Sequence, residues 1–346
     1  VHYIYESEAV MMTYLRENWS RLITDTEAME ERVFVVYDMG GATINATAFK
    51  LKVYTYSRKG NTNIRSVDVE TIAKVGYCVG GDDIDYALIK MIYGAPSVKE
   101  AIADPESHQR KYKAGLIALA RNIKLDWIDT IKGVNSGTKD IQTFWHKIQS
   151  EFARKELGNI YMPAEFSDAD KKYFEKEGRN RTNMKKYVLE FVEDAVKNLF
   201  ATIEANSKIE LIMSGRSVLY PGVRESVEKA ITASNCTDIT LWSGYNDGKG
   251  NFSSEKVKSA VATGACWYAM YSDKINMRND IITTSFGYLE MVNGEQVFRP
   301  MIERGSRFDE HGECKSTIDT LSELQFVRFI QMMGMDYDTI WTKSIR

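Results

Sequence analysis

An acid, two glycines and a hydroxyl stand side by side in the stretch VYDMGGATINATAF, residues 36–49. Asp38 ends an aliphatic run, Gly40 and Gly41 follow, and Thr43 comes next. Glycine lets backbone N–H groups approach an anion closely, and consecutive N–H groups can form a concave anion-binding nest. A carboxylate at a strand end can hold Mg²⁺ through water. The pattern fits a hairpin tip that wraps around a phosphate, and it equally fits a glycine turn that binds nothing.

Two further turns of small residues add weight to the phosphate interpretation. GYCVGGDDID at 76–85 places two glycines where a predicted strand meets a helix. MSGRSVLYPGV at 213–223 runs from a strand through Ser-Gly into a helix that carries a proline. Turns that follow strand carboxyl ends in an α/β fold converge on one cleft. We therefore expect the three turns to meet.

The elements that position these turns follow from hydrophobic period and turn residues. We expect strands at 2–5, 32–38, 44–56, 67–77, 209–213 and 238–242, and helices at 8–18, 82–94, 111–127, 184–204, 221–233 and 253–271. Residues 19–31 are polar and charged, and we expect a loop or an edge insertion there. From 281 the character changes to β, with a hairpin turn at Asn293-Gly294 and a strand within 316–333. Alternating strands and helices followed by strands predict an α/β domain and then a β-rich one.

Composition limits the partners. The chain has 346 residues and a formal net charge of −3, so no global positive field favours nucleic acid or an anionic membrane, and neither is expected as a partner. No apolar run is long enough to span a bilayer, and no signal-peptide pattern opens the sequence. The four cysteines, at 78, 236, 266 and 314, are scattered without CxxC spacing. Free thiols in a reducing compartment are expected.

Several motifs together resemble the seventy-kilodalton heat-shock chaperone family of actin-like ATPases. FVVYDMGGATINATAF is similar to that family's phosphate loop, F-D-L-G-G-G-T-F-D-V-S. The resemblance extends, in the family's order and over nearly the whole chain, to YIYESEAVMMTYL, VGGDDIDYALI, LIMSGRSVLYPGV, VKSAVATGACWYA and TSFGYLEMVNGEQVFRPMIERGSRF. The Tyr-Asp-Met-Gly form of the loop is similar to the family's large heat-shock and endoplasmic-reticulum members.

The resemblance implies a fold and a set of site residues. It implies an α/β, actin-like (ribonuclease H-like) ATPase lobe at 1–280 with a helical subdomain at about 95–206, and the start of a β-sandwich substrate-binding domain at 281–346. The implied cofactors are ATP or ADP and Mg²⁺, which Asp38 would hold through water. By position, the implied catalytic residues are Glu6, Asp38 and Thr43, and the implied nucleotide contacts are Gly40, Gly41, Ala42, Gly80, Gly81, Lys124, Ser214, Gly215 and Arg216.

The sequence also departs from the family pattern. The departures are Ala42 for a glycine, Asn45 for an acid, Ser7 for a proline, Arg121, Leu125 and Ile128 around Lys124, Lys258 for an acid, and an unusual linker at 271–280. Because Val1 falls within the first expected strand, we expect upstream residues to carry the first phosphate loop and the catalytic lysine. A helical lid would follow Arg346.

Three functions are compatible with these residues. The first is an ATP-driven chaperone that hydrolyses ATP to control its grip on extended or unfolded polypeptide, aided by co-chaperones. The second is a nucleotide-binding but catalytically degenerate scaffold or nucleotide-exchange co-chaperone, which the departures favour. The third is a filament-forming actin-like protein, which the strands after 281 disfavour. Cytoplasm is the expected compartment, with the endoplasmic reticulum lumen as the alternative. Helix capping accounts for Asp82, Asp83 and Asp85 better than paired catalytic carboxylates do.

Overall fold

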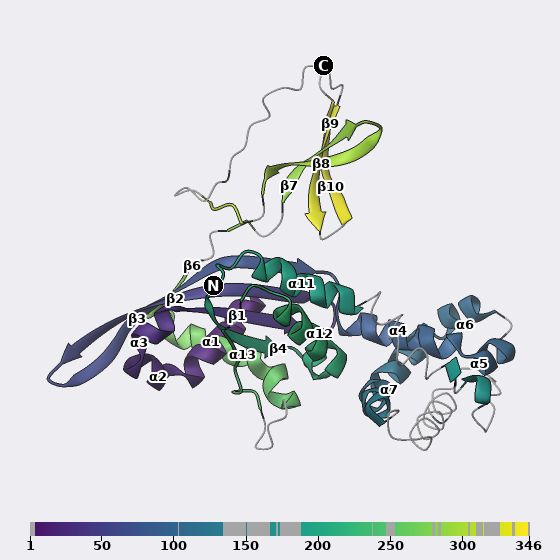
Figure 1. The fold of residues 1–346 in the computed structure, drawn as a ribbon, viewed down its shortest axis with the longest axis horizontal. Helices are drawn as coiled ribbons and strands as arrows, with labels where there is room; N and C mark the ends of the chain where they lie inside the picture. The colour runs from purple at the N-terminus through teal and green to yellow at the C-terminus, as the bar shows by residue number, and fades with distance from the viewer. Residues whose placement is uncertain are drawn as a thin grey trace.

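The structure is a computed structural model that contains two sheets and an outlying group of helices (Figure 1). It describes residues 4–102, 104–133, 150, 167–170, 172–173, 188–236, 238–246, 253–278, 281–282, 285–303, 305–308, 314, 326–333 and 336–344. Most of residues 134–187, within the expected helical subdomain, lie outside these residues, as do positions 1–3 of the first expected strand.

A mixed sheet of six strands forms the centre of the first domain. Its strands are β1 (Arg32–Met39), β2 (Ile44–Arg58), β3 (Asn61–Tyr77), β4 (Lys208–Ser214), β5 (Ile239–Leu241) and β6 (Ile275–Arg278), in the order β5-β4-β1-β2-β3-β6. The first three strands are antiparallel, whereas β4 runs parallel to β1 and β5 parallel to β4. Strand β1 is buried on both faces, which its aliphatic run requires. The α/β class predicted from the sequence is confirmed.

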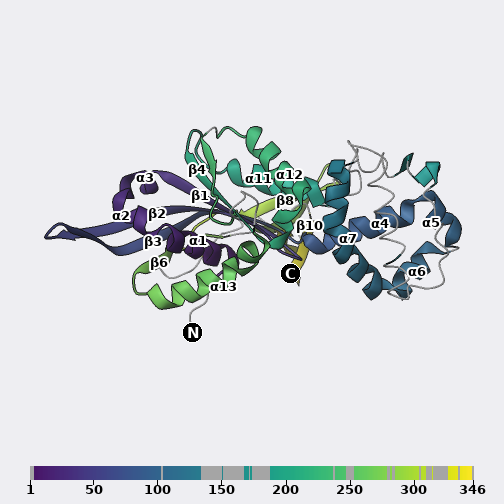
Figure 2. The same cartoon turned by 90° about the horizontal axis from the view of Figure 1, so that it is seen from below.

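Helices cover both faces of this sheet (Figure 2). On one face lie α1 (Glu6–Glu17) and α13 (Ser254–Tyr271), and on the other lie α11 (Glu190–Phe200) and α12 (Pro221–Thr232). Helix α1 is buried from Ser7 to Leu15. It packs so closely on α13 that a Cβ at Gly264 would overlap the carbonyl oxygen of Ala9, and Thr13 Oγ1 donates a 2.7 Å hydrogen bond to Ala260 O.

A helical group extends from the end of β3. It consists of α4 (Gly81–Gly94), α5 (Pro96–Ala101), α6 (Pro105–Lys111) and α7 (Lys113–Gly133), and it lies at the opposite end of the domain from the β2–β3 hairpin tip (Figures 1 and 2). Within the expected stretch at about 95–206, α5, α6 and α7 belong to this group. Helix α11, which the sequence placed inside that subdomain, instead packs against β2 and β3. Its apolar face is strongly one-sided, and the sheet buries it.

The second sheet confirms that the sequence after 281 is rich in strands. It contains β7 (Phe286–Val292), β8 (Glu295–Ile302), β9 (Phe326–Met333) and β10 (Asp336–Ser344), in the order β10-β9-β7-β8. The β7–β8 turn falls at Asn293 (φ 52°) and Gly294 (φ 85°), the positive values that a two-residue hairpin of this type requires. Arg307 Nη2, in the segment between β8 and β9, lies 2.6 Å from Glu70 Oε1 on β3, so this segment contacts the first sheet. The second layer of a sandwich is not among the described elements.

Three segments have structure that the sequence did not predict. Residues 19–31 form two short helices, α2 (Trp19–Thr24) and α3 (Thr26–Glu30), because Leu22 and Met29 are buried and Glu30 Oε1 accepts the N–H of Val53 on β2 at 3.0 Å. Residues 4 and 5 form no strand. The expected linker contains β6, which pairs in parallel with β3. Among the described helices, none has the length and apolarity needed to cross a membrane.

Candidate functional site at the carboxyl ends of β1 and β4

A buried carboxylate marks the point where the strand order of the sheet reverses. From β1 the chain turns to β2 on one side, while β4 lies on the other, and ligands of α/β sheets bind beyond the strand ends at such points. Asp38, next to last in β1, pairs in register with Ser214 at the end of β4 and with Asn45 on β2. Its side chain is 5 % exposed. The sequence therefore predicted correctly that this acid ends a buried strand.

The surroundings of Asp38 disfavour its charge. Burial, together with the nearby negative charge of Glu6, raises the pKa of Asp38 to about 6, and proximity of the Ser214 hydroxyl offsets only part of this. Glu6 is exposed at the first turn of α1. The ionised form of a carboxyl group held in this way is unfavourable in the isolated protein. A bound cation would offset the free-energy cost of that charge. Elevated acid pKa values of this kind concentrate at functional sites.

Two buried hydroxyls beside Asp38 lack partners. Among the described buried side chains, Ser214 Oγ and the Tyr245 hydroxyl make no hydrogen bond of ordinary geometry. Tyr245 follows β5, and burial together with the charge of Asp38 raises its pKa. Buried polar atoms without partners are uncommon and are usually explained by an absent ligand, ion or water. Sequence reasoning missed Tyr245, although its place after the next parallel strand was a usable signal.

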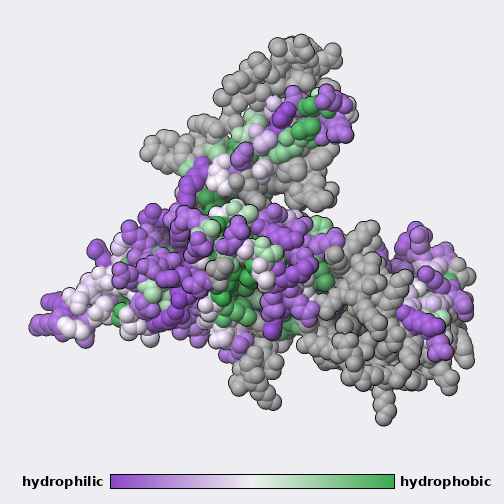
Figure 3. All heavy atoms as spheres, viewed as in Figure 1, coloured by the Kyte–Doolittle hydropathy of each residue, from purple (hydrophilic) through white to green (hydrophobic). Residues whose placement is uncertain are grey.

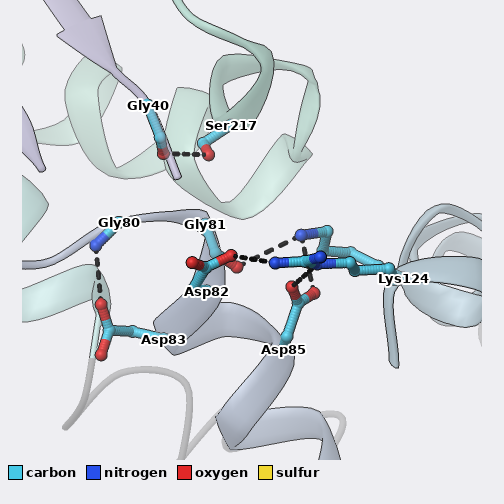
Figure 4. A network of polar contacts seen from close by, with 9 residues as sticks. Gly40, Gly80, Gly81, Asp82, Asp83, Asp85, Lys124 and Ser217 are labelled. Atoms are coloured by element: carbon cyan, nitrogen blue, oxygen red, sulfur yellow. Dashed lines mark hydrogen bonds and ion pairs between the residues drawn. The ribbon is translucent and has the colours of Figure 1, made fainter. Parts of the chain in front are cut away.

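The three glycine-containing turns meet through hydrogen bonds, of which Figure 4 marks the one between Ser217 and Gly40. The carbonyl oxygen of Gly40 accepts the N–H of Gly81 at 2.9 Å and the Ser217 hydroxyl at 2.8 Å. The carbonyl oxygen of Gly41 accepts the N–H of Asp82 at 2.8 Å. The predicted convergence of the turns is therefore confirmed. Ser217 was missed, since nothing in its local sequence marks it as the link between two of them.

Two of these glycines are required by close packing. Gly215 has φ of 82°, and a Cβ there would overlap the Met39 carbonyl oxygen. A Cβ at Gly80 would overlap the carbonyl oxygen of Gly41. The N–H of Gly81 is used by Gly40, and the N–H of Gly80 is held by Asp83 Oδ2 at 2.7 Å. Gly80 and Gly81 therefore shape the site without offering these N–H groups to an anion.

The hairpin tip itself is open. Gly41 and Ala42 are exposed, and a Cβ at Gly40 would meet nothing within 4 Å. Thr43 is half-buried, and its hydroxyl accepts a 3.3 Å hydrogen bond from Asn45 Nδ2. Asn45, the residue that replaces an acid of the resembled motif, therefore holds Thr43 in place. The tip can present backbone N–H groups and one hydroxyl to an anion.

Lys124 lies beside the turns, but an acid already holds it (Figure 4). Its Nζ is 2.7 Å from Asp85 Oδ1 and donates to the carbonyl oxygen of Gly81 at 3.2 Å. Burial raises the pKa of Asp85, and the ion pair with Lys124 opposes that rise. Arg121 Nη2 lies 3.1 Å from Asp82 Oδ1. Its Nε also lies 3.5 Å from Asp85 Oδ2, so Asp82 and Asp85 share this arginine, and only Asp83 caps the helix as predicted.

The remaining site residue, Arg216, is exposed in the short 3₁₀ helix after β4. Among the described residues, no group of three His, Cys, Asp or Glu side chains could enclose a metal ion. A metal here would rest on Asp38 and on oxygen ligands of other kinds, which suits Mg²⁺ because it keeps most of its water.

No protein-family model matches this chain, and no curated protein matches it.

Proposed function

We propose that this chain is part of an ATP-dependent chaperone of the seventy-kilodalton heat-shock type, in which an actin-like nucleotide lobe controls a β-rich domain that binds extended polypeptide. One observation carries the proposal: the buried carboxylate of Asp38 lies beside the unpartnered Ser214 hydroxyl, at the strand ends where three glycine turns meet. The order of motifs along the sequence, and three antiparallel strands followed by two parallel ones, also support it.

The residues present fit a magnesium nucleotide. Asp38 would hold Mg²⁺ through water, and the ion would offset the charge of the phosphates. Backbone N–H groups of Gly41 and Ala42 would bind phosphate oxygens, and Thr43, held by Asn45, would bond to the terminal phosphate. Glu6 would orient the attacking water. Phosphoryl transfer needs little beyond such positioning and charge stabilisation.

The route from the nucleotide to the second domain would be strand β3. Its carboxyl end leads to the turn at Gly80, while Glu70 in the same strand binds Arg307 of the β-rich segment. Strand β6, just before that segment, adds to β3 over Val67–Glu70. A shift of the turn on nucleotide binding could therefore alter the contact that holds the β-rich domain, and with it the grip on polypeptide.

A nucleotide-binding scaffold or exchange co-chaperone without hydrolysis is the second candidate. The ion pair between Lys124 and Asp85 favours it, because it removes a cation from the nucleotide contacts that the family resemblance implies. Asn45 also lacks the charge of the acid it replaces. These features bear on catalysis more than on binding, because Asp38, Gly41 and Thr43 are retained.

Isothermal titration of Mg-ATP and Mg-ADP into the natural polypeptide, including any residues before Val1, tests the proposal. Asp38→Asn is the test variant, and Asp273→Asn, an exposed acid after α13, is the matched control. We expect micromolar or tighter binding that needs Mg²⁺ and is lost only in Asp38→Asn. Binding followed by phosphate release supports the chaperone, and binding without release supports the scaffold. Absence of binding contradicts both.

A further inference from the structure

The β2–β3 hairpin continues well beyond the sheet. Strand β1 pairs with β2 only as far as Lys50, and β6 pairs with β3 only from Val67, so residues 51–66 have no third described strand beside them and are here called the arm. Figures 1 and 2 show the arm at the end of the domain away from the helical group. No part of the proposed nucleotide site lies on the arm, so its length needs a separate explanation.

The arm is strongly cationic for its size. It contains Lys52, Arg58, Lys59 and Arg65 and no acid, which gives +4 in a chain of net charge −3, so the remainder carries −7. All four side chains are exposed, and within the described residues none forms an ion pair. Lys52 at least lies opposite Asp68 in the strand register. The cations at the tip have no such neighbour.

Aromatic rings are interleaved with these charges. Tyr56 is 51 % exposed, and Lys52 Nζ lies 5.4 Å from the ring centroid of Tyr54. The arm tip is purple to white in Figure 3, so it offers polar and amphipathic side chains and not an apolar patch. A surface of this kind suits a charged partner that also contacts ring faces.

The arm also leaves strand edges unpaired. Strand β6 pairs with β3 only over Val67–Glu70, and among the described strands none pairs with residues 61–66 on that side. On the other side, Glu30 accepts the N–H of Val53, so the edge of β2 is partly used. A free edge can receive an extended polypeptide as an added strand, which a nucleic acid cannot supply.

We propose that the arm is a docking surface for an extended, acidic segment of a partner protein. The segment would add to the open edge of β3 and place carboxylates beside Arg58, Lys59 and Arg65. The charge of the rest of the molecule argues for polypeptide over nucleic acid, because the −7 remainder would repel a long polyphosphate while a short acidic segment meets only the arm. This inference does not depend on nucleotide binding.

Fluorescence anisotropy with a defined probe tests the proposal. The probe is a synthetic peptide that alternates glutamate with threonine, added to the full chain without nucleotide. A peptide with glutamine in place of glutamate and a thymidine oligonucleotide of equal charge are the comparison ligands. The test variant is Arg58→Glu with Lys59→Glu and Arg65→Glu. The control variant makes the same charge change on the exposed surface of the helical group, by Lys99→Glu with Arg110→Glu and Lys113→Glu.

We expect the acidic peptide to bind the wild type and the control equally, and the arm variant at least about tenfold more weakly, from three exposed charge contacts. Binding should weaken as salt rises from about 0.05 M to about 0.15 M, because screening shortens the reach of the charges. Replacing the same three residues by glutamine, which perturbs folding less than charge reversal, should cause an intermediate loss of affinity for the peptide. The proposal is wrong if the peptide does not bind, if both triple variants bind equally, or if the oligonucleotide binds more tightly than the peptide.

Discussion

Replacing Asp38 by asparagine should make the protein more stable while removing its magnesium-dependent nucleotide binding. The pKa of Asp38 rises from 3.8 to about 6 on folding, mainly through burial. A shift of about two units corresponds to about 3 kcal/mol between the protonation states, which is an upper bound on the gain. Asparagine has nearly the same shape and cannot ionise.

The sign of the effect fixes its pH dependence. Between about pH 4 and pH 6 the folded protein binds more protons at Asp38 than the unfolded chain does, so the wild type loses stability as pH rises through this window. The loss of stability caused by ionising the buried Asp38 is fully present above about pH 6 and absent below about pH 4. The advantage of Asp38→Asn should therefore be greatest at neutral pH and vanish near pH 4.

Thermal unfolding of the wild type and Asp38→Asn across this pH range measures the difference. Asp273→Asn should match the wild type throughout, and Glu6→Gln should recover a smaller part of the gain, since Glu6 is the second cause of the shift. Mg²⁺ with nucleotide should stabilise the wild type and not Asp38→Asn. A variant that is less stable than the wild type at neutral pH, or a difference that does not change with pH, would refute the reasoning.

Two further predictions concern packing and the contact between domains. Gly264→Ala should destabilise the protein by about 2 kcal/mol, because the new methyl group would overlap the Ala9 carbonyl oxygen and push α1 away from α13. This loss should exceed the gain from alanine's better helix propensity. An unchanged melting temperature would contradict this prediction. Arg307→Ala should change global stability by less than about 1 kcal/mol, since both partners are well exposed, yet should speed limited proteolysis between the two sheets. Glu70→Ala should produce the same cleavage pattern, and the double variant should be cleaved little faster than either single variant. Additive effects on the cleavage rate would show that the two side chains do not act as a contact.

The strand ends and their turns could be predicted because each depends on a short local pattern. An aliphatic run that stops at Asp38, and others that stop before Gly80 and Ser214, locate carboxyl ends of buried strands without knowledge of the sheet. Convergence then follows from the geometry of α/β sheets. The hydrogen bonds at the Gly40 carbonyl oxygen confirm that step.

Features that depend on a distant partner could not be predicted. Asp85 has the sequence appearance of a helix N-terminal acid, and only the position of α7 shows that it holds Lys124. Strand β6 has only four residues, too few for a period to distinguish it from a linker. The buried Leu22 and Met29 anchor two helices within a stretch whose other residues are mostly polar, so average polarity concealed them.

The contact between α1 and α13 has a consequence for how the chain is made. Thr13 donates a hydrogen bond to Ala260 across 247 residues, so α1 is synthesised long before the helix that covers it. At a synthesis rate of about 5 to 20 residues per second, the apolar surface of α1 waits about 12 to 50 s for its cover. The newly made chain therefore exposes the apolar surface of α1 until α13 has left the ribosome.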